Sequence, residues 1–139
     1  MKNVYPVFFT QAKDVILIEV PDFGILTQGK NMNDAIDMAR DAMELLCVSL
    51  EDEKEEIPLP SELKKLQIAN GTFAAEGETF ISLVDIDSEE YRRKMDTRTV
   101  RRNVALPSWL NYEAEKAHIN VSRVLQEALI STLGLQRKI

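Results

Sequence analysis

Residues 99–135 read TVRRNVALPSWLNYEAEKAHINVSRVLQEALISTLGL, and this stretch decides how the C-terminal part of the chain must fold. Residues 99–106 have the character of one short β-strand, which ends at Pro107 because proline has no backbone N–H to donate. Two helical patterns follow, separated by residues 118–120. A single strand followed by two short helices leaves a row of backbone N–H and C=O groups without partners. We therefore expect two copies of the chain to pair these strands antiparallel across a two-fold axis.

Side chains alternate between the two faces of the expected strand. The order strand, helix, helix in a dimer is the layout of ribbon-helix-helix DNA-binding proteins, whose two-stranded ribbon lies in the major groove. Arginine can pair with guanine and asparagine with adenine through two hydrogen bonds each, whereas an alanine offers only a methyl to thymine. The opposite face, with its apolar residues, is expected to pack on the helices. Arg102 lies on that face too, and its role stays open. The expected base-facing residues are Thr99, Arg101, Asn103 and Ala105.

The two helical patterns have recognisable ends. Ser108 is the expected N-cap of the first and Asn120 of the second, and Gly134 is the expected C-cap of the second. Together with Ser122 and Arg123, Asn120 lies where the backbone N–H groups of a helix N-terminus can hold a DNA phosphate. Capping alone would also explain Asn120 and Ser122.

The two halves of the chain carry opposite charge. Residues 1–90 contain seven Lys+Arg and nineteen Asp+Glu, a net charge of −12, whereas residues 91–139 contain ten and four, a net charge of +6. A basic segment suits a polyanion such as DNA, and an acidic domain suits a basic partner. The alternative for the first half is an acidic surface that only keeps the protein soluble.

The N-terminal half predicts a small α+β layer. Residues 32–50 place apolar side chains, Cys47 among them, three or four positions apart, as in an amphipathic helix capped by Asn31 or Asn33. We place Arg40 and Glu44 on the polar side of that helix. The order β-β-β-α-β predicts the helix on one face of a small sheet. Short helical turns are expected at residues 61–66 and around Tyr91, and the second strand is expected to be covered on both sides. The segments of strand character are residues 3–10, 15–20, 25–29 and 78–86.

The sequence argues against an enzyme. With only Cys47 and His118, the chain has no internal disulfide and little material for a metal site or a Ser-His triad. A two-metal nuclease would need converging carboxylates, but acidic residues at strand ends are also ordinary solvated turn residues. We expect no catalytic residue, no metal and no cofactor. The carboxylates in question are Asp14, Glu19, Asp22, Asp85 and Asp87.

The cellular location follows from what the sequence lacks. No apolar run is long enough to span a bilayer, and the N-terminal residues MKNVYPVFF do not have the pattern of a signal peptide. A single cysteine agrees with a reducing compartment. We expect a cytoplasmic protein without a membrane partner.

Two motifs together resemble the HicB-type antitoxins: residues 21–46 (PDFGILTQGKNMNDAIDMARDAMELL) with EIPLPS at 56–61, and residues 101–129 (RRNVALPSWLNYEAEKAHINVSRVLQEAL). The resemblance implies a truncated ribonuclease-H-like domain without nuclease activity, which binds and blocks a small basic HicA-type toxin, an mRNA-cleaving ribonuclease. It also implies a ribbon-helix-helix domain that binds the promoter of its own operon. Arg102, Ala105 and Ile119 depart from the family pattern, in which an apolar residue, a polar or hydroxyl residue and a glycine, respectively, are usual.

We therefore predict an acidic toxin-binding domain at residues 1–90, a charged connector at 91–98 and a ribbon-helix-helix DNA-binding and dimerisation domain at 99–139. The leading hypothesis is an antitoxin that is also a repressor of its own operon, acting as a homodimer or a higher oligomer. One alternative is a ribbon-helix-helix regulator with a small-molecule-sensing N-terminal domain, and another is a nuclease related to ribonuclease H. A neighbouring gene for a small basic protein would favour the first hypothesis.

Overall fold

The computed structural model describes residues 1–136, and the chain divides into two compact units, Met1–Met95 and Asp96–Ile139. The first is an α+β unit with a sheet, and the second contains two helices. Across residues 1–136, no helix is both long and apolar enough to cross a membrane.

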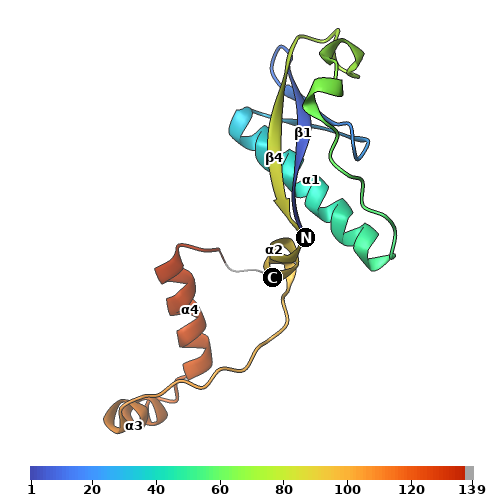
Figure 1. Cartoon of the computed structure of the whole chain (residues 1–139). Coiled ribbons are helices and arrows are strands. Elements are labelled where there is room, and N and C mark those ends of the chain that lie inside the picture. The colour runs from blue at the N-terminus through green and yellow to red at the C-terminus, as the bar shows by residue number, and fades with distance from the viewer. Residues whose placement is uncertain (137–139) are drawn as a thin grey trace. The chain divides into compact units, whose positions relative to one another are not determined.

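The first unit is built on a four-stranded antiparallel sheet (Figure 1). β1 and β4 pair along their whole length, from Lys2↔Asp87 to Gln11↔Glu78, so the first and last strands of the unit lie side by side. All four strands lie where the sequence predicted them. In the spatial order β3-β2-β1-β4, their bounds are β3 (Ile25–Gly29), β2 (Ile16–Val20), β1 (Lys2–Gln11) and β4 (Glu78–Asp87).

Helix α1 (Met32–Asp52) lies across one face of this sheet (Figure 1). Of the two expected caps, Asn31 is the N-cap, and its side chain accepts a hydrogen bond from the N–H of Asp34 at 2.9 Å. The apolar side of the helix meets the apolar face of the sheet, and this contact forms the core of the unit. The core residues are Tyr5, Val7, Phe9, Ile16, Ile18, Val20, Ala35, Ala39, Met43, Cys47, Val84 and Ile86.

Two residues of α1 test the predicted periodicity. Cys47 is buried as expected, and burial raises the pKa of its thiol to about 11, with smaller contributions from the carboxylates of Glu51 and Glu44. The prediction for Glu44 is wrong, because this residue is only 8% exposed. Its carboxylate turns inward to accept a hydrogen bond from the backbone N–H of Asp87 at the end of β4.

The other face of the sheet is partly covered by the segment between α1 and β4. This segment contains two short 3-10 turns, η1 (Leu63–Lys65), close to an expected helical turn, and η2 (Ile68–Asn70). Thr72 fastens it to β2 by donating from its backbone N and from Oγ1 to the carboxylate of Glu19, at 2.8 and 2.6 Å. On this face Leu17 is half-buried, so the strand expected to be covered on both sides is fully covered on one.

Helix α2 (Ser88–Met95) continues directly from β4 and packs on α1. The helical turn expected around Tyr91 is thus the middle of a longer helix. Arg92 donates from Nη2 to Oδ1 of Asp52 at 2.9 Å, which ties α2 to the last turn of α1. The first unit therefore extends to Met95.

The second unit contains α3 (Ser108–Lys116) and α4 (Val121–Leu133). The prediction that Ser108 is the N-cap of α3 is wrong, because Ser108 is the first helical residue and Pro107 occupies the cap position. The predicted caps of α4 are confirmed. Asn120 accepts a hydrogen bond from the N–H of Arg123 at 3.2 Å, and Gly134 adopts the left-handed conformation, with φ 67°, that ends helices.

The segment before α3 has no regular structure in the single chain. Residues 96–107 are assigned to neither helix nor strand. A strand is recognised by its hydrogen-bonded partner, and the partner expected for residues 99–106 is the same segment of a second copy. The ribbon therefore stays a prediction.

Candidate functional site

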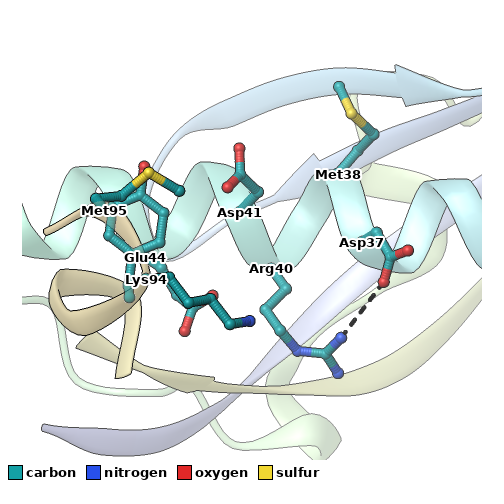
Figure 2. A pocket seen from close by; sticks show the side chains of 8 residues that line it. Asp37, Met38, Arg40, Asp41, Glu44, Lys94 and Met95 are labelled. Atoms are coloured by element: carbon teal, nitrogen blue, oxygen red, sulfur yellow. Dashed lines mark ion pairs between the residues drawn. The ribbon is translucent and has the colours of Figure 1, made fainter. Parts of the chain in front are cut away.

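The first unit has a hollow of about 470 Å³ between α1 and α2 (Figure 2). We call it the α1–α2 hollow. Asp37 and Asp41 are exposed on its α1 side, and the apolar side chains of Met38 and Met95 lie beside them. The lining holds three carboxylates and two cationic side chains, Arg40 and Lys94, together with soft apolar groups. The excess of one negative charge suits a positively charged, partly apolar side chain. The hollow is lined by Asp37, Met38, Arg40, Asp41, Glu44, Tyr91, Lys94 and Met95.

Arg40 connects this hollow to the sheet. In Figure 2 its side chain extends from α1 toward β4, with Asp37 at an ion-pair distance of 3.7 Å. Its Nε donates to the backbone carbonyl of Asp85 at 2.9 Å, and its Nη2 donates to Oδ1 of Asp85 at 2.8 Å. The hydrogen bond from Arg40 holds the pKa of the Asp85 carboxyl below its ordinary value of 3.8.

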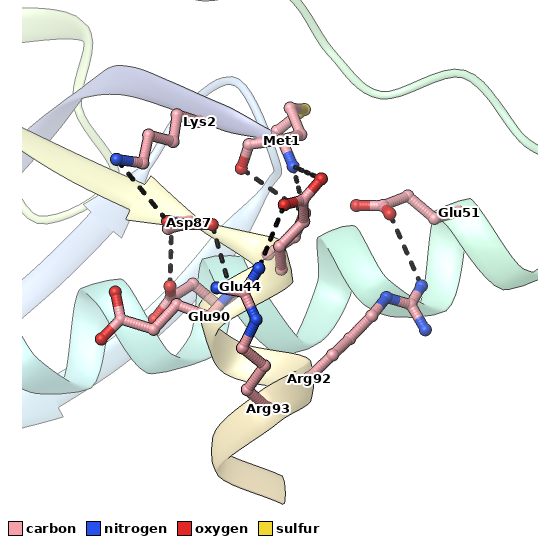
Figure 3. A network of polar contacts seen from close by, with 10 residues as sticks. Met1, Lys2, Glu44, Glu51, Asp87, Glu90, Arg92 and Arg93 are labelled. Atoms are coloured by element: carbon pink, nitrogen blue, oxygen red, sulfur yellow. Dashed lines mark hydrogen bonds and ion pairs between the residues drawn. The ribbon is translucent and has the colours of Figure 1, made fainter. Parts of the chain in front are cut away.

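A polar network fixes the junction of β4, α1 and α2 (Figure 3). The N–H of Asp87 donates to Oε2 of Glu44 at 2.9 Å, and the amino group of Met1 donates to Oγ of the buried Ser88 at 3.0 Å. Arg92 also approaches Oε2 of Glu51 at 3.5 Å. These bonds join the first strand, the long helix and the last helix of the unit, so the floor of the hollow is held in place.

The carboxylates considered for a nuclease do not converge. Glu19 binds Thr72, as described, and Asp22 accepts hydrogen bonds from the backbone N and Oγ of Ser61. Asp85 binds Arg40, and Asp87 accepts from the N–H of Glu90 at 3.1 Å at the start of α2. Within residues 1–136 no group of three potential metal ligands is present. Four of the five carboxylates thus fasten loops and helices to the sheet.

The predicted DNA-facing residues fall into two sets. Asn120, Ser122 and Arg123 lie together at the start of α4, where Asn120 caps the helix and Nε of Arg123 is 3.1 Å from Oε1 of Glu127. The second set lies in the irregular segment before α3, and every one of its side chains is exposed in the single chain. That set comprises Thr99, Arg101, Asn103 and Ala105.

The described part of the second unit lacks a core of its own. None of residues 96–136 is buried, and Trp109 is 67% exposed. The face of residues 99–106 that was expected to pack on the helices is open as well, with Val100 at 84% exposure. A soluble domain rarely leaves its apolar stripe in water. Other large apolar side chains exposed there are Val104, Leu110, Tyr112, Ile119, Val124, Leu129, Leu133 and Leu135.

Sequence reasoning missed the residues that organise the first site. Arg40 and Glu44 were assigned to the solvent side of α1, whereas both bind the backbone of β4. Both sit on the edge of the apolar stripe, next to the buried Ala39 and Met43. The sequence shows only that a charged residue flanks the apolar stripe of the helix. It does not show which backbone group that side chain will bind.

Comparisons with known proteins cover both units. A family model described as "HicB_like antitoxin of bacterial toxin-antitoxin system" matches residues 5–128. A chain of a solved "Toxin-Antitoxin complex from Streptococcus pneumoniae" is 21% identical, with a TM-score of 0.59, over 95% of this chain and 99% of that one. The "Crystal structure of the Burkholderia Pseudomallei antitoxin HicB" is 20% identical, with a TM-score of 0.49, over 94% and 96%. No curated protein matches. The chain belongs to the HicB-like antitoxin family of bacterial toxin–antitoxin systems.

Proposed function

We propose that this antitoxin binds and inhibits a small basic HicA-type toxin that cleaves mRNA, and that as a dimer it represses its own operon by placing a β-ribbon in the DNA major groove. The observation that carries the proposal is the charge difference between the two units. Residues 1–95 contain ten Lys+Arg and nineteen Asp+Glu, a net charge of −9, whereas residues 96–139 contain seven and four, a net charge of +3. One unit suits a cation and the other a polyanion.

The first unit is the toxin-binding part of this proposal. Opposite charge speeds encounter and disfavours wrong partners, while buried apolar contacts supply affinity. The α1–α2 hollow offers both, with Asp37 and Asp41 beside Met38 and Met95. The similar solved chain of Streptococcus pneumoniae belongs to a toxin–antitoxin complex, which supports a toxin as the partner. Because the carboxylates of the sheet serve structural bonds, we assign this unit no catalytic role.

The second unit is the DNA-binding part. Its exposed apolar side chains favour dimerisation, because strand pairing and helix packing with a second copy across a two-fold axis would bury them. The paired strands would then present Arg101 and Asn103 to base edges, with Thr99 and Ala105 beside them. Asn120, Ser122 and Arg123 would meet the phosphate backbone at the N-terminus of α4.

Co-expression with the product of the neighbouring gene tests the first half of the proposal. The full chain should co-purify with a small basic protein and suppress its cleavage of mRNA. A version ending at residue 98 should keep that activity, because the core of the first unit lies within residues 1–95. Failure of both versions to bind the neighbouring product would refute the inhibitor function.

Gel-shift measurements with the operon's promoter test the second half. The full chain should bind as a dimer, with an affinity that falls steeply as salt rises. The version ending at residue 98 should neither bind the promoter nor dimerise through the ribbon. Equal promoter binding by the two versions would contradict the assignment of residues 99–139.

A further inference from the structure

Strand β4 lies at the edge of the sheet, and α1 closes that edge at one end only. The carbonyl of Asp85 accepts from Nε of Arg40, and the N–H of Asp87 donates to Oε2 of Glu44, both at 2.9 Å. These backbone groups therefore face away from β1. In an antiparallel ladder, every second residue directs its N–H and C=O to the same side. The residues of β4 that share this outward orientation are Thr79, Ile81 and Leu83.

The backbone of these three residues is open. No hydrogen bond joins their outward N–H and C=O groups to any part of residues 1–136. An open strand edge is a template for an added strand, and proteins usually block it with charges or covering elements. Here the block by Arg40 and Glu44 ends at Asp85, so residues 79–83 remain accessible. We call this stretch the open β4 edge.

The side chains around the open β4 edge define what fits it. Phe80 is 44% exposed on the helix side of the sheet, and Leu83 is 53% exposed on the other side. Glu78 places a carboxylate at one end, whereas the carboxylate of Asp85 at the other end is already paired with Arg40. The α1–α2 hollow, which shares Arg40 and Glu44 with the closed part of this edge, adds the exposed carboxylate of Asp41. An added strand would thus meet apolar groups in its middle, with the negative charge of Glu78 and Asp41 around them.

A second copy of the first unit suits this edge poorly, because it would bring together two units that each carry a net charge of −9. A basic protein brings the opposite charge. We propose that the open β4 edge takes an extended segment of the toxin as a fifth strand, apolar in the middle and flanked by Lys or Arg. This inference rests on the proposed toxin-binding function and adds the mode of binding.

Proline scanning tests it, with the full chain and the co-expressed neighbouring gene product. Leu83→Pro removes an outward N–H and leaves the bonds between β4 and β1 in place. Leu26 is the matched control, because it is also 53% exposed and the same alternation turns its N–H outward on β3, at the opposite edge. Leu83→Pro should weaken toxin binding by about tenfold or more, and Leu26→Pro should not. Leu83→Ala keeps the N–H, so its toxin affinity should lie between those of the two proline variants.

Amide exchange of the wild-type chain, followed by NMR, gives a readout that needs no variant. The N–H groups of Thr79, Ile81 and Leu83 should exchange freely alone and become protected in the toxin complex, while that of Leu26 should not change. A complex that forms without this protection, or that Leu83→Pro leaves at full affinity, overturns the added strand but not the inhibitor function. If these N–H groups are protected without toxin, and the protection rises with protein concentration, the edge pairs with a second copy of the chain. That result would also overturn the proposed toxin strand. Absence of any complex refutes the inhibitor function and the inference with it.

Discussion

Oε2 of Glu44 accepts a hydrogen bond from the backbone N–H of Asp87 at 2.9 Å, and this contact joins the middle of α1 to the end of β4. The carboxylate is nearly buried, at 8% residue exposure, so water cannot readily replace it. Together with the bonds from Arg40 to Asp85, it closes one end of the sheet edge and supports the α1–α2 hollow. Helix α1 therefore contributes both to the core and to the lining of the candidate site.

Removal of the Glu44 carboxylate should destabilise the first unit. Glu44→Ala leaves the N–H of Asp87 without an acceptor, and we expect the free energy of unfolding to fall by about 1–3 kcal/mol. Urea unfolding followed by circular dichroism measures this change. Glu44→Gln keeps an acceptor and should lose less stability. Asp41 is an exposed neighbour on α1, and the stability of Asp41→Ala should stay within about 0.5 kcal/mol of wild type. Equal stability of Glu44→Ala and Asp41→Ala would show that the bond contributes nothing.

The buried thiol of Cys47 predicts a pH dependence at the alkaline end. Its pKa rises from the ordinary 9.0 to about 11 in the folded chain, chiefly through burial. Between these values the unfolded chain loses the thiol proton while the folded chain keeps it, so stability should fall as pH rises from 9 toward 11. Urea unfolding at several pH values should show a shallower decline for Cys47→Ala. If the stability of Cys47→Ala and of the wild type declines equally with pH, the thiol is not the origin of the decline.

Charge reversal on α1 should slow toxin capture. Asp41→Lys places a cation in the α1–α2 hollow, and the association rate at low salt should fall by about tenfold, with the difference shrinking at high salt. Surface plasmon resonance measures both rate constants. Glu55→Lys changes the net charge equally but lies outside the lining of the hollow. If both variants slow association to the same extent, only the overall charge matters.

Base recognition should depend on two residues of the predicted ribbon. Arg101→Ala and Asn103→Ala should each weaken binding to the operon's promoter by about 1–3 kcal/mol and affect unrelated DNA less. Fluorescence anisotropy with both DNAs gives the comparison. Arg102→Ala, on the opposite strand face, should change both affinities to the same extent. Unchanged promoter affinity for Arg101→Ala and Asn103→Ala would refute the assigned register.

Much of the fold was predictable because it depends on local patterns. Runs of β-branched and aromatic residues gave the strands, and apolar spacing with the cap Asn31 gave α1. Asn120 and Gly134 likewise mark the ends of α4 in the sequence as in the structure. Such signals depend on residues a few positions apart, so they can be recognised without knowledge of the tertiary contacts.

The candidate site was less predictable because its bonds join distant segments. Arg40 reads as a solvent residue of an amphipathic helix, and its partner Asp85 lies 45 positions further on. Residues 91–98 read as a charged connector because they lack apolar periodicity, but residues 91–95 belong to α2, and Arg92 binds Asp52 of α1. No local pattern encodes which helix will pass beside which strand edge.

By itself, the sequence determined the positions of β1 to β4, α1, α3 and α4, the division of charge between the two halves and the family motifs, since each depends on neighbours in the chain or on composition. Only the tertiary structure decided that Glu44 turns inward, that Arg40 and Glu44 close one end of β4, and that residues 79–83 stay open. The physical reason is that a polar side chain near an apolar stripe takes its orientation from the unpaired backbone group that folding brings within reach.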